Sequence, residues 1–415
     1  MRFIADFHIH SKYSRATSPQ MDLEHLDRAA RIKGIKVLGT GDFTHPEWFK
    51  NLKEKLEPAE PGLYRLKNSD SETRFILTSE ISCIYSKGGR VRKIHIIVFA
   101  PSFEIVEKIS THLGWIGNLR ADGRPILGLD AKELAKIVLG ISEDCLVVPS
   151  HAWTPWFSIF GSRSGFDSIE ECFDDYSKYI YSIETGLSSN PAMNWRLSAL
   201  DKITLISCGD AHSPQKIGRE ANVFDTEISY SKILEAIKSK NPQKFLYTIE
   251  FFPQEGKYHY DGHRNCQISL SPQESKKYNN ICPTCGRPLT IGVLNRVEKL
   301  ADRPEGFKPE GAIPFKSLVP LNEIIAEGLG VNIGTKQGET EYKNLIKKFD
   351  NEFKILLEVP RKDLEAITLP EIAEGIIRVR EGKLYVTPGF DGVFGKIRIF
   401  SQGEQRILSR QGILF

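Results

Sequence analysis

The sequence has 415 residues, of which 40% are hydrophobic and 26% are charged, with 33 glycines and 22 prolines. This is the composition of a globular protein with enough residues for two or three domains, and it excludes collagen-like, low-complexity and wholly disordered chains. Because 56 lysines and arginines nearly balance 53 aspartates and glutamates, the net charge is only +3. The overall charge therefore neither favours nor excludes a nucleic-acid partner, which would need a local basic surface.

The N-terminal residues lack the apolar stretch of a signal peptide, and the chain has no uninterrupted apolar run of about 18 residues. Four of the seven cysteines are scattered singly in apolar contexts, where reduced and buried thiols are expected. The sequence therefore predicts a cytoplasmic protein without a membrane partner.

Residues 1–250 alternate short β-branched runs with amphipathic helical patterns. Strands are predicted at residues 2–7, 35–38, 74–77, 93–99, 145–148, 178–183 and 203–207. Helices are predicted between several of them, at residues 22–33, 130–139 and 191–200. This alternation predicts an α/β fold with a parallel sheet, and seven such units favour a closed (β/α)7 barrel over an open sheet.

Histidines and carboxylates accompany these strands, nearly always at the C-terminal end. His8 and His10 follow the first strand, whereas His95 lies within the fourth. In a (β/α) barrel the C-terminal ends of the strands converge on one face, where the active site is built. We therefore predict one shared catalytic and metal site made of His8, His10, Asp42, Glu80, His95, His151, Asp210 and His212.

Imidazole and carboxylate ligands suit divalent ions, and this set is larger than one ion requires. Both imidazoles of a His-X-His pair point to the same side of a strand, and carboxylates such as Glu80 or Asp210 can bridge two ions. Two or three catalytic zinc, manganese or magnesium ions at one site favour phosphoester hydrolysis. Serine-nucleophile chemistry is less favoured because no Gly-X-Ser-X-Gly motif lies beside a strand.

Six segments resemble the successive motifs of the PHP (polymerase and histidinol phosphatase) superfamily: ADFHIHS at 5–11, GTGDFTH at 39–45, SEIS at 79–82, KIHIIVFA at 93–100, PSHAW at 149–153 and CGDAHSP at 208–214. The resemblance implies a distorted (β/α)7 barrel with a two- or three-metal phosphoesterase site. The second motif departs from the usual Thr-Asp-His, with Phe43 in place of the histidine, so whether His45 or Glu184 joins the site stays open. Arg15 stands near another common ligand position; either the third metal position is lost there, or Arg15 contacts the substrate phosphate.

A second metal signal follows the predicted barrel. His263 and Cys266 are separated by fifteen residues from Cys282 and Cys285, which lie in a Cys-Pro-Thr-Cys-Gly turn. This spacing predicts one structural zinc with four protein ligands, in which His259 is the rival of His263 for the fourth position. A closed site of this kind contributes stability rather than catalysis, and we expect the module to need its metal in order to fold.

The rest of the chain is predicted to be mainly helical, with helices at residues 322–329, 339–349 and 370–380. The sequence thus divides into a metallophosphoesterase barrel at 1–250, a zinc-binding module at 251–300 and a C-terminal DNA-interaction block at 301–415.

The segments GKYHYDGHRNC at 256–266 and CPTCGRPLTIGVLNRVEKLADRP at 282–304, together with the motifs above, resemble the endonuclease Q family over essentially the whole chain. The resemblance implies a DNA repair endonuclease that nicks double- or single-stranded DNA 5′ of deaminated bases (uracil, hypoxanthine, xanthine) and abasic sites, leaving 3′-hydroxyl and 5′-phosphate ends. The alternatives are a small-molecule phosphoesterase of the histidinol-phosphatase kind, and a non-catalytic zinc-containing DNA-binding protein with a degenerate barrel.

An enzyme that selects a damaged base must read the edge of that base, usually after flipping it out of the stack. The aromatic residues that follow His151 are predicted to stack on the flipped base or to wedge the gap, unless they cap the hydrophobic layer of the barrel: Trp153, Trp156 and Phe157. The last five residues, Gln411 to Phe415, resemble the first part of a sliding-clamp-binding motif and suggest a clamp as a further partner.

Overall fold

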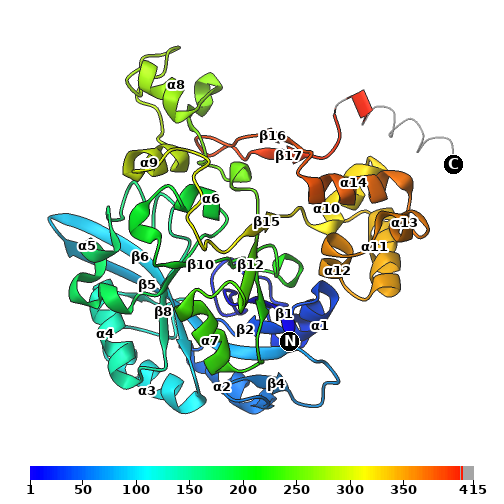
Figure 1. Ribbon diagram of the computed structural model, residues 1–415. Coiled ribbons are helices and arrows are strands. Elements are labelled where there is room, and N and C mark those ends of the chain that lie inside the picture. The colour runs from blue at the N-terminus through cyan, green and yellow to red at the C-terminus, as the bar shows by residue number, and fades with distance from the viewer. Residues whose placement is uncertain (402, 405–415) are drawn as a thin grey trace.

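The computed structural model describes residues 1–401, 403 and 404 (Figure 1). The suggested clamp-binding segment, Gln411 to Phe415, lies outside these residues. Figure 1 shows an α/β region that contains the N-terminus, a small lobe with α8 (Pro272–Lys277) and α9 (Val293–Leu300), and a helical lobe on the other side. In this part of the chain, no helix combines the length and the apolar character that a membrane crossing requires.

A strand forms in each of the seven predicted segments, and the main sheet is mixed. Its centre is parallel and consists of β1 (Arg2–Asp6), β2 (Val37–Gly39) and β5 (Arg74–Lys87). On one side β11 (Ala221–Asp225) runs antiparallel to β1 and is followed by antiparallel β12 (Phe245–Glu250). The remaining strands of this sheet are β3 (Leu56–Pro58), β4 (Tyr64–Leu66), β6 (Arg90–Ala100), β7 (Ile126–Leu127), β8 (Leu146–Pro149) and β15 (Phe315–Ser317).

The prediction of a parallel sheet throughout is wrong at β6, which runs antiparallel to both β5 and β8. No helix separates β5 from β6, because the chain reverses at Gly88 and Gly89, whose φ angles are 62° and 71°. Two successive positive φ angles produce the tight turn of a hairpin, and glycine adopts them without strain. A separate parallel pair is formed by β9 (Ser182–Glu184) and β10 (Thr204–Ile206).

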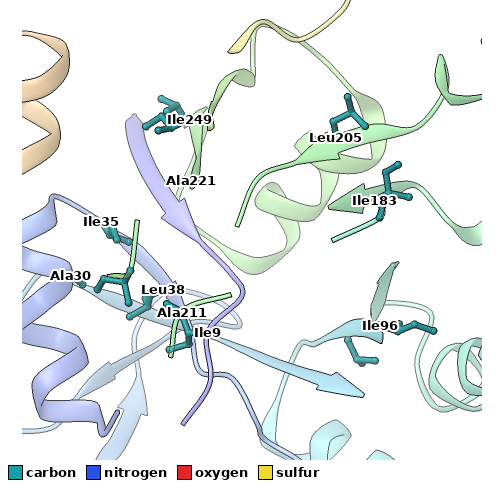
Figure 2. Packing of buried hydrophobic residues seen from close by; sticks show 14 of the residues in the cluster. Ile9, Ala30, Ile35, Leu38, Ile96, Ile183, Leu205, Ala211, Ala221 and Ile249 are labelled. Atoms are coloured by element: carbon teal, nitrogen blue, oxygen red, sulfur yellow. The ribbon is translucent and has the colours of Figure 1, made fainter. Parts of the chain in front are cut away.

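Helices connect these strands. The first, α1 (Leu23–Lys33), begins at Asp22, whose carboxylate accepts a hydrogen bond from the backbone N–H of His25. Figure 2 shows its Ala30, and Ile35 beyond its end, packed beside Leu38 of β2. The others are α2 (Pro46–Lys55), α3 (Phe103–Gly114), α4 (Ala131–Ile141), α5 (Ile169–Phe173), α6 (Pro191–Asn194) and α7 (Tyr230–Ser239).

The predicted helix at 191–200 is shorter than expected, because α6 ends at Asn194 and only a 3-10 turn, Ser198–Leu200, follows. Between them Arg196 extends to the small lobe, where its Nη2 donates to Glu298 Oε2 at 2.6 Å. A side chain from the segment between these two helices therefore joins two parts of the molecule.

The small lobe contains an antiparallel pair, β13 (Asp261–His263) and β14 (Ile268–Leu270). The helical lobe has more helices than predicted: α10 (Leu321–Leu329), α11 (Lys336–Phe349), α12 (Glu352–Leu357), α13 (Arg361–Glu365) and α14 (Pro370–Glu381). A final hairpin of β16 (Tyr385–Thr387) and β17 (Lys396–Arg398) follows it.

The turn of this last hairpin returns to the small lobe. Backbone N–H groups of Gly389 and Gly395 donate to the carbonyl oxygens of Gln254 and Glu255, at 2.8 and 3.0 Å. The backbone N–H of Tyr260 in turn donates to Gly389. The turn of the β16–β17 hairpin is thus fastened to the segment that precedes β13.

A buried ion pair joins the helical lobe to α1. Lys33 Nζ lies 2.8 Å from Glu352 Oε2, and the two side chains are only 11% and 4% exposed. Glu352 also accepts hydrogen bonds from the backbone N–H of Leu321 and the hydroxyl of Tyr342. One carboxylate therefore holds three helices of the C-terminal lobe against the α/β region.

We expect Lys33→Met to lower the free energy of unfolding by about 3–5 kcal/mol, because it leaves the Glu352 carboxylate buried without its cation. The matched control is Lys36→Met, whose partner Glu72 is 86% exposed, and which should cost less than about 1 kcal/mol. Denaturant titration of both variants measures the difference. Equal stability of the two variants would show that the Lys33–Glu352 pair does not hold the lobes together.

Candidate metal centre and adjoining cavity

Side chains from the ends of several strands meet at one place in the α/β region. His8 and His10 follow β1, Glu80 lies in β5, and Asp210 follows β10. One ligand atom from each of these four residues lies within 4.8 Å of the others. The sequence prediction that distant imidazoles and carboxylates converge is therefore confirmed for these four side chains.

The first cluster is short of hydrogen-bond partners. His10 Nε2 lies 3.0 Å from Asp210 Oδ1 and 3.4 Å from Glu80 Oε2. His8 Nε2 is 3.6 Å from both Glu80 Oε1 and Asp210 Oδ1. Yet His8 Nε2, His10 Nε2, Glu80 Oε1 and Asp210 Oδ1 are buried and make no hydrogen bond with the described residues. Buried polar atoms left in this way need a ligand, and a divalent cation fits this donor set.

A second cluster shares Glu80 with the first. His95 Nδ1 and His151 Nε2 each lie 3.2 Å from Glu80 Oε1 and 3.2 Å from each other. Glu80 and His95 share a face because Glu80 pairs with Ile97 across the β5–β6 ladder, two residues from His95. A carboxylate that belongs to two ligand groups can bridge two ions.

Two further carboxylates orient the imidazoles from behind. Glu184 lies 3.0 Å from His8 Nδ1 and also accepts from the backbone N–H of His151 at 2.6 Å. Asp42 lies 2.9 Å from His10 Nδ1. When Nδ1–H donates to a carboxylate, the lone pair of Nε2 is left for the cluster, as in metal-binding histidines generally. The open question about Glu184 is thereby answered: it positions His8.

The prediction of Asp42 as a direct metal ligand is not supported by its contacts. Its second oxygen, Oδ2, accepts from the backbone N–H of Ser11 at 2.6 Å and from the hydroxyls of Ser11 and Ser14 at 2.7 and 2.8 Å. Both oxygens are thus engaged within the protein, and Asp42 holds His10 instead. His45 does not join the cluster either, because it caps α2 and its ring stacks on Tyr13.

Two further predicted residues, His212 and Arg15, are not members of either cluster. The ring of His212 is 4.7 Å from that of His10, and its Nδ1 donates to the backbone oxygen of Asp210 at 2.7 Å. Arg15 is 75% exposed and pairs with Asp122, its Nε lying 3.2 Å from Oδ2. The Nε2 atom of His212 does not take part in the hydrogen bond to Asp210. The Arg15 side chain faces solvent.

Sequence analysis did not find Arg124, whose Nη1 donates to Glu80 Oε2 at 2.9 Å. Among the described residues it is the only lysine or arginine in ion-pair contact with Glu80 or Asp210. Its loop is fixed by Asp122, which accepts from the backbone N–H of both Arg15 and Arg124. Arg124 lies in a loop with no motif around it, so the sequence alone gave no signal.

The charges of the site shift one another strongly. Burial alone would lower the pKa of His8, but Glu184, Glu80 and Asp210 outweigh it and hold that pKa well above its usual value. For the Glu80 carboxyl, burial alone would raise the pKa. His95, His8 and Arg124 instead bring it well below the usual value. For His95 burial prevails and lowers the pKa to about 4. Glu80 is thus ionised, which is the form in which a carboxylate coordinates cations.

Three residues of the site have a left-handed backbone conformation. His151, Asp210 and Asp42 have φ angles of 28°, 45° and 49°, in the region that residues other than glycine seldom adopt. Such strain persists only where the surrounding structure enforces it, and it commonly marks functional sites.

A cavity of about 460 Å³ opens beside the two clusters. Its lining includes His95, His151 and Asp210 on the cluster side, and Trp156 and Phe157 from the loop after β8. The ring of Phe157 lies 4.7 Å from that of His95. Two of the three predicted aromatic residues therefore border the space next to the candidate metal centre.

The prediction that Trp153 contacts a base is wrong, because its side chain is buried, with 1% exposure. Its Nε1 donates to Asn194 Oδ1 at 2.8 Å, and its ring packs against Phe160. Trp153 thus belongs to the hydrophobic layer, as the alternative interpretation of this aromatic run had it.

The small lobe holds the other predicted cluster. Ligand atoms of His263, Cys266, Cys282 and Cys285 lie within 4.8 Å of one another, and His263 Nδ1 is 3.6 Å from Cys285 Sγ. Burial alone would raise the pKa of Cys282, but the backbone N–H groups of Cys285 and Thr284 bring it down to about 7. A thiol that ionises this readily suits zinc.

His259, the rival for the fourth zinc position, does not belong to this cluster. It lines the cavity beside the candidate metal centre instead. The structure therefore favours His263 as the fourth zinc ligand.

We expect Glu184→Gln to weaken the affinity of the α/β region for divalent ions by about 10–100-fold, because a neutral amide no longer fixes the His8 ring. Calorimetric titration of the metal-stripped protein with Mn²⁺ measures this, and the exposed Glu143→Gln serves as control. Unchanged affinity in Glu184→Gln would mean that His8 keeps its orientation without this contact.

For the small lobe we expect His263→Ala to lose tightly bound zinc, whereas His259→Ala retains it. The physical reason is that only His263 places a ring nitrogen among the three thiols. Zinc per chain, measured by elemental analysis after gel filtration, decides between them. Loss of zinc from His259→Ala alone would reverse the assignment.

Comparison with known proteins places this geometry in a family. Residues 320–383 match the family described as MJ0043 C-terminal domain. MJ0043 of Methanocaldococcus jannaschii is 35% identical over 259 residues, which are 60% of this chain and 31% of that protein, so the chain spans about a third of its length. YqxK of Bacillus subtilis is 28% identical and matches 96% of this chain and 99% of its own length.

Two solved structures match nearly the whole chain. The crystal structure of the lesion-specific endonuclease PfuEndoQ from Pyrococcus furiosus has a TM-score of 0.86 and 31% identity, covering 96% of this chain and 95% of that one. A complex of endonuclease Q with a 27-mer duplex that carries an abasic lesion at the active site has a TM-score of 0.84 and 31% identity, covering 97% and 98%. The chain therefore belongs to the endonuclease Q family.

Proposed function

We propose that this chain is a metal-dependent DNA repair endonuclease. It hydrolyses the phosphodiester bond 5′ of deaminated bases (uracil, hypoxanthine, xanthine) and of abasic sites, leaving 3′-hydroxyl and 5′-phosphate ends. The observation that carries the proposal is a set of buried imidazole and carboxylate atoms that find no hydrogen-bond partner among the described residues and lie directly beside a cavity. In this proposal residues 1–250 are a distorted PHP-type barrel, 251–300 a zinc module, and 301–415 a DNA-interaction domain.

The two ligand groups suit two catalytic ions, either zinc, manganese or magnesium. His8, His10, Glu80 and Asp210 would hold one, and Glu80, His95 and His151 the other, with His212 beside them. Bound divalent ions lower the pKa of water and offset the charge of the attacking and leaving oxygens. A structural zinc would be held by His263, Cys266, Cys282 and Cys285.

The protein itself positions and neutralises the reacting groups. Glu184 and Asp42 fix the tautomers of His8 and His10. Arg124 pairs with Glu80, and Arg15 pairs with Asp122, which also holds the Arg124 loop, so both cations would offset the negative charge of a bound DNA phosphate. In the reaction an oxygen of water bonds to phosphorus and releases its proton to solvent. The bond to the 3′ oxygen of the preceding nucleotide breaks, and that oxygen takes up a proton.

The cavity gives a reason for lesion selectivity. A base can reach it only when it is rotated out of the duplex, and this costs less for a deaminated base because its pair is weak or mismatched. Trp156 is 41% exposed and forms an edge contact with Tyr258, whose ring centroid lies 5.9 Å away. An aromatic surface of this kind stacks on an extruded base or fills the gap that the base leaves.

Asp210→Asn should reduce nicking of lesion-containing duplexes by about 100-fold or more while binding stays measurable, because it removes the charge of an atom that faces both His8 and His10. End-labelled duplexes with one uracil, hypoxanthine, xanthine or abasic site, incubated with Mg²⁺, Mn²⁺ or Zn²⁺, give the rates. Gel shifts give the binding, and the exposed Asp225→Asn is the control.

Two outcomes would overturn the proposal. Full nicking by purified Asp210→Asn would contradict the metal assignment. Hydrolysis of a phosphate monoester by the wild-type protein, with no nicking of any duplex, would point to a small-molecule phosphoesterase.

A further inference from the structure

His259 lines the cavity but belongs to none of the candidate metal-binding groups. Its side chain is only 4% exposed, and its Nδ1 is buried without a hydrogen-bond partner among the residues that the structure describes. It lines the same cavity as His95, His151 and Asp210. A buried nitrogen that lacks a partner among the described residues, in a side chain that lines a cavity, is a candidate for contact with a ligand.

The position of the ring is well defined. It stacks on Tyr260, with ring centroids 5.5 Å apart and planes 18° apart. Its backbone N–H donates to Gly256, and its backbone oxygen accepts from Leu294 at the start of α9. The histidine is thus held in place before any ligand arrives, which lowers the entropic cost of a contact.

The hydrogen-bonding character of Nδ1 follows from its surroundings. Burial lowers the pKa of His259 to about 4, so the imidazole is neutral near pH 7 and has one donor and one acceptor nitrogen. Nδ1 has no hydrogen-bond partner among the described residues, so in the tautomer with the proton on Nε2 its lone pair is left for a ligand.

Deamination changes the edge of a base in a way that this lone pair can read. It replaces an amino group by a carbonyl oxygen, and the neighbouring ring nitrogen becomes an N–H donor. Cytosine N3 and adenine N1 are acceptors, whereas uracil N3 and the N1 of hypoxanthine and xanthine are donors.

We propose, on the basis of the proposed function, that His259 is a specificity-determining residue whose Nδ1 accepts a hydrogen bond from this newly formed N–H. An undamaged cytosine or adenine would set a lone pair against a lone pair in a buried place. A site built for a hydrogen bond discriminates strongly against a ligand that leaves its polar group unpaired.

This hydrogen bond distinguishes a deaminated base only from the base that it was formed from. Thymine and guanine carry the same N–H, so their exclusion depends on the strength of their pairs and on the shape of the cavity. An abasic site has no base edge at all, and its cleavage cannot use this hydrogen bond. Abasic DNA is therefore the internal reference for any change at His259.

The test compares nicking rates at uracil and hypoxanthine with the rate at an abasic site, under single turnover. His259→Phe keeps an aromatic ring without the nitrogens, and both base-to-abasic ratios should fall by about 10–100-fold. His259→Asn offers a carbonyl acceptor and should restore part of each ratio. His112→Phe, on the exposed side of α3, should leave the ratios as in the wild type.

A modified substrate tests the same hydrogen bond from the side of the DNA. With 3-methyluracil, which has no N3–H, the wild-type ratio should fall, and His259→Phe should add little to that loss. Equal slowing at all three lesions, or loss of zinc from His259→Phe, would give the residue a structural role and overturn the proposal. So would unchanged ratios in His259→Phe. A wild-type protein that nicks no lesion refutes the proposed function as well, which distinguishes the two failures.

Discussion

The carboxylate of Glu80 is fully buried and faces imidazole nitrogens of His8, His10, His95 and His151 as well as the guanidinium of Arg124. A charge taken out of water in this way is stable only where opposite charge and hydrogen bonds replace the lost solvation. Much of the α/β region serves this requirement. The strands β1, β5, β6, β8 and β10 each end at or pass through the site, and Glu184 and Asp42 hold the imidazoles that complete it.

The same requirement explains why the two ligand groups are not independent. Glu80 has only two oxygens, and each lies close to a different set of side chains: Oε1 is near the imidazoles of His8, His95 and His151, and Oε2 is near Arg124 and His10. A cation bound in one group would neutralise part of the Glu80 charge, and this would weaken the attraction of the other group for a second cation. Arg124, the one permanent cation at this carboxylate among the described residues, therefore adjusts the charge of both groups at once.

The sequence was informative where local pattern and chemistry coincide. Placement after a strand pointed to His8, His10, His151 and Asp210, whereas Glu80 and His95 lie in the middle of β5 and β6 and reach the same place through the β5–β6 pairing. The spacing of thiols located the small-lobe cluster, because four ligands around one ion need little more than two short turns. Three C-terminal helices were found from their periodicity, whereas the short helices α12 and α13 were missed.

What failed depended on contacts that no local pattern encodes. Asp42 follows a strand as a ligand would, but Ser11 and Ser14 occupy its second oxygen. Trp153 and Trp156 are three residues apart, and only the turn of the loop decides which is buried. The Gly88–Gly89 turn was a readable hairpin signal, and overlooking it made β6 look parallel. Arg124 and His259 matter because of neighbours that are distant in sequence.

The turn of the β16–β17 hairpin has a consequence for how this protein can be re-engineered or can diverge. It supplies backbone partners to Gln254, Glu255 and Tyr260, in the same segment as Pro253 and His259 of the cavity wall. Two stretches that lie far apart in the chain thus form one unit and share their hydrogen bonds. A chimera that took only the C-terminal lobe of a relative would inherit half of this unit, so both stretches have to be exchanged, or to evolve, together.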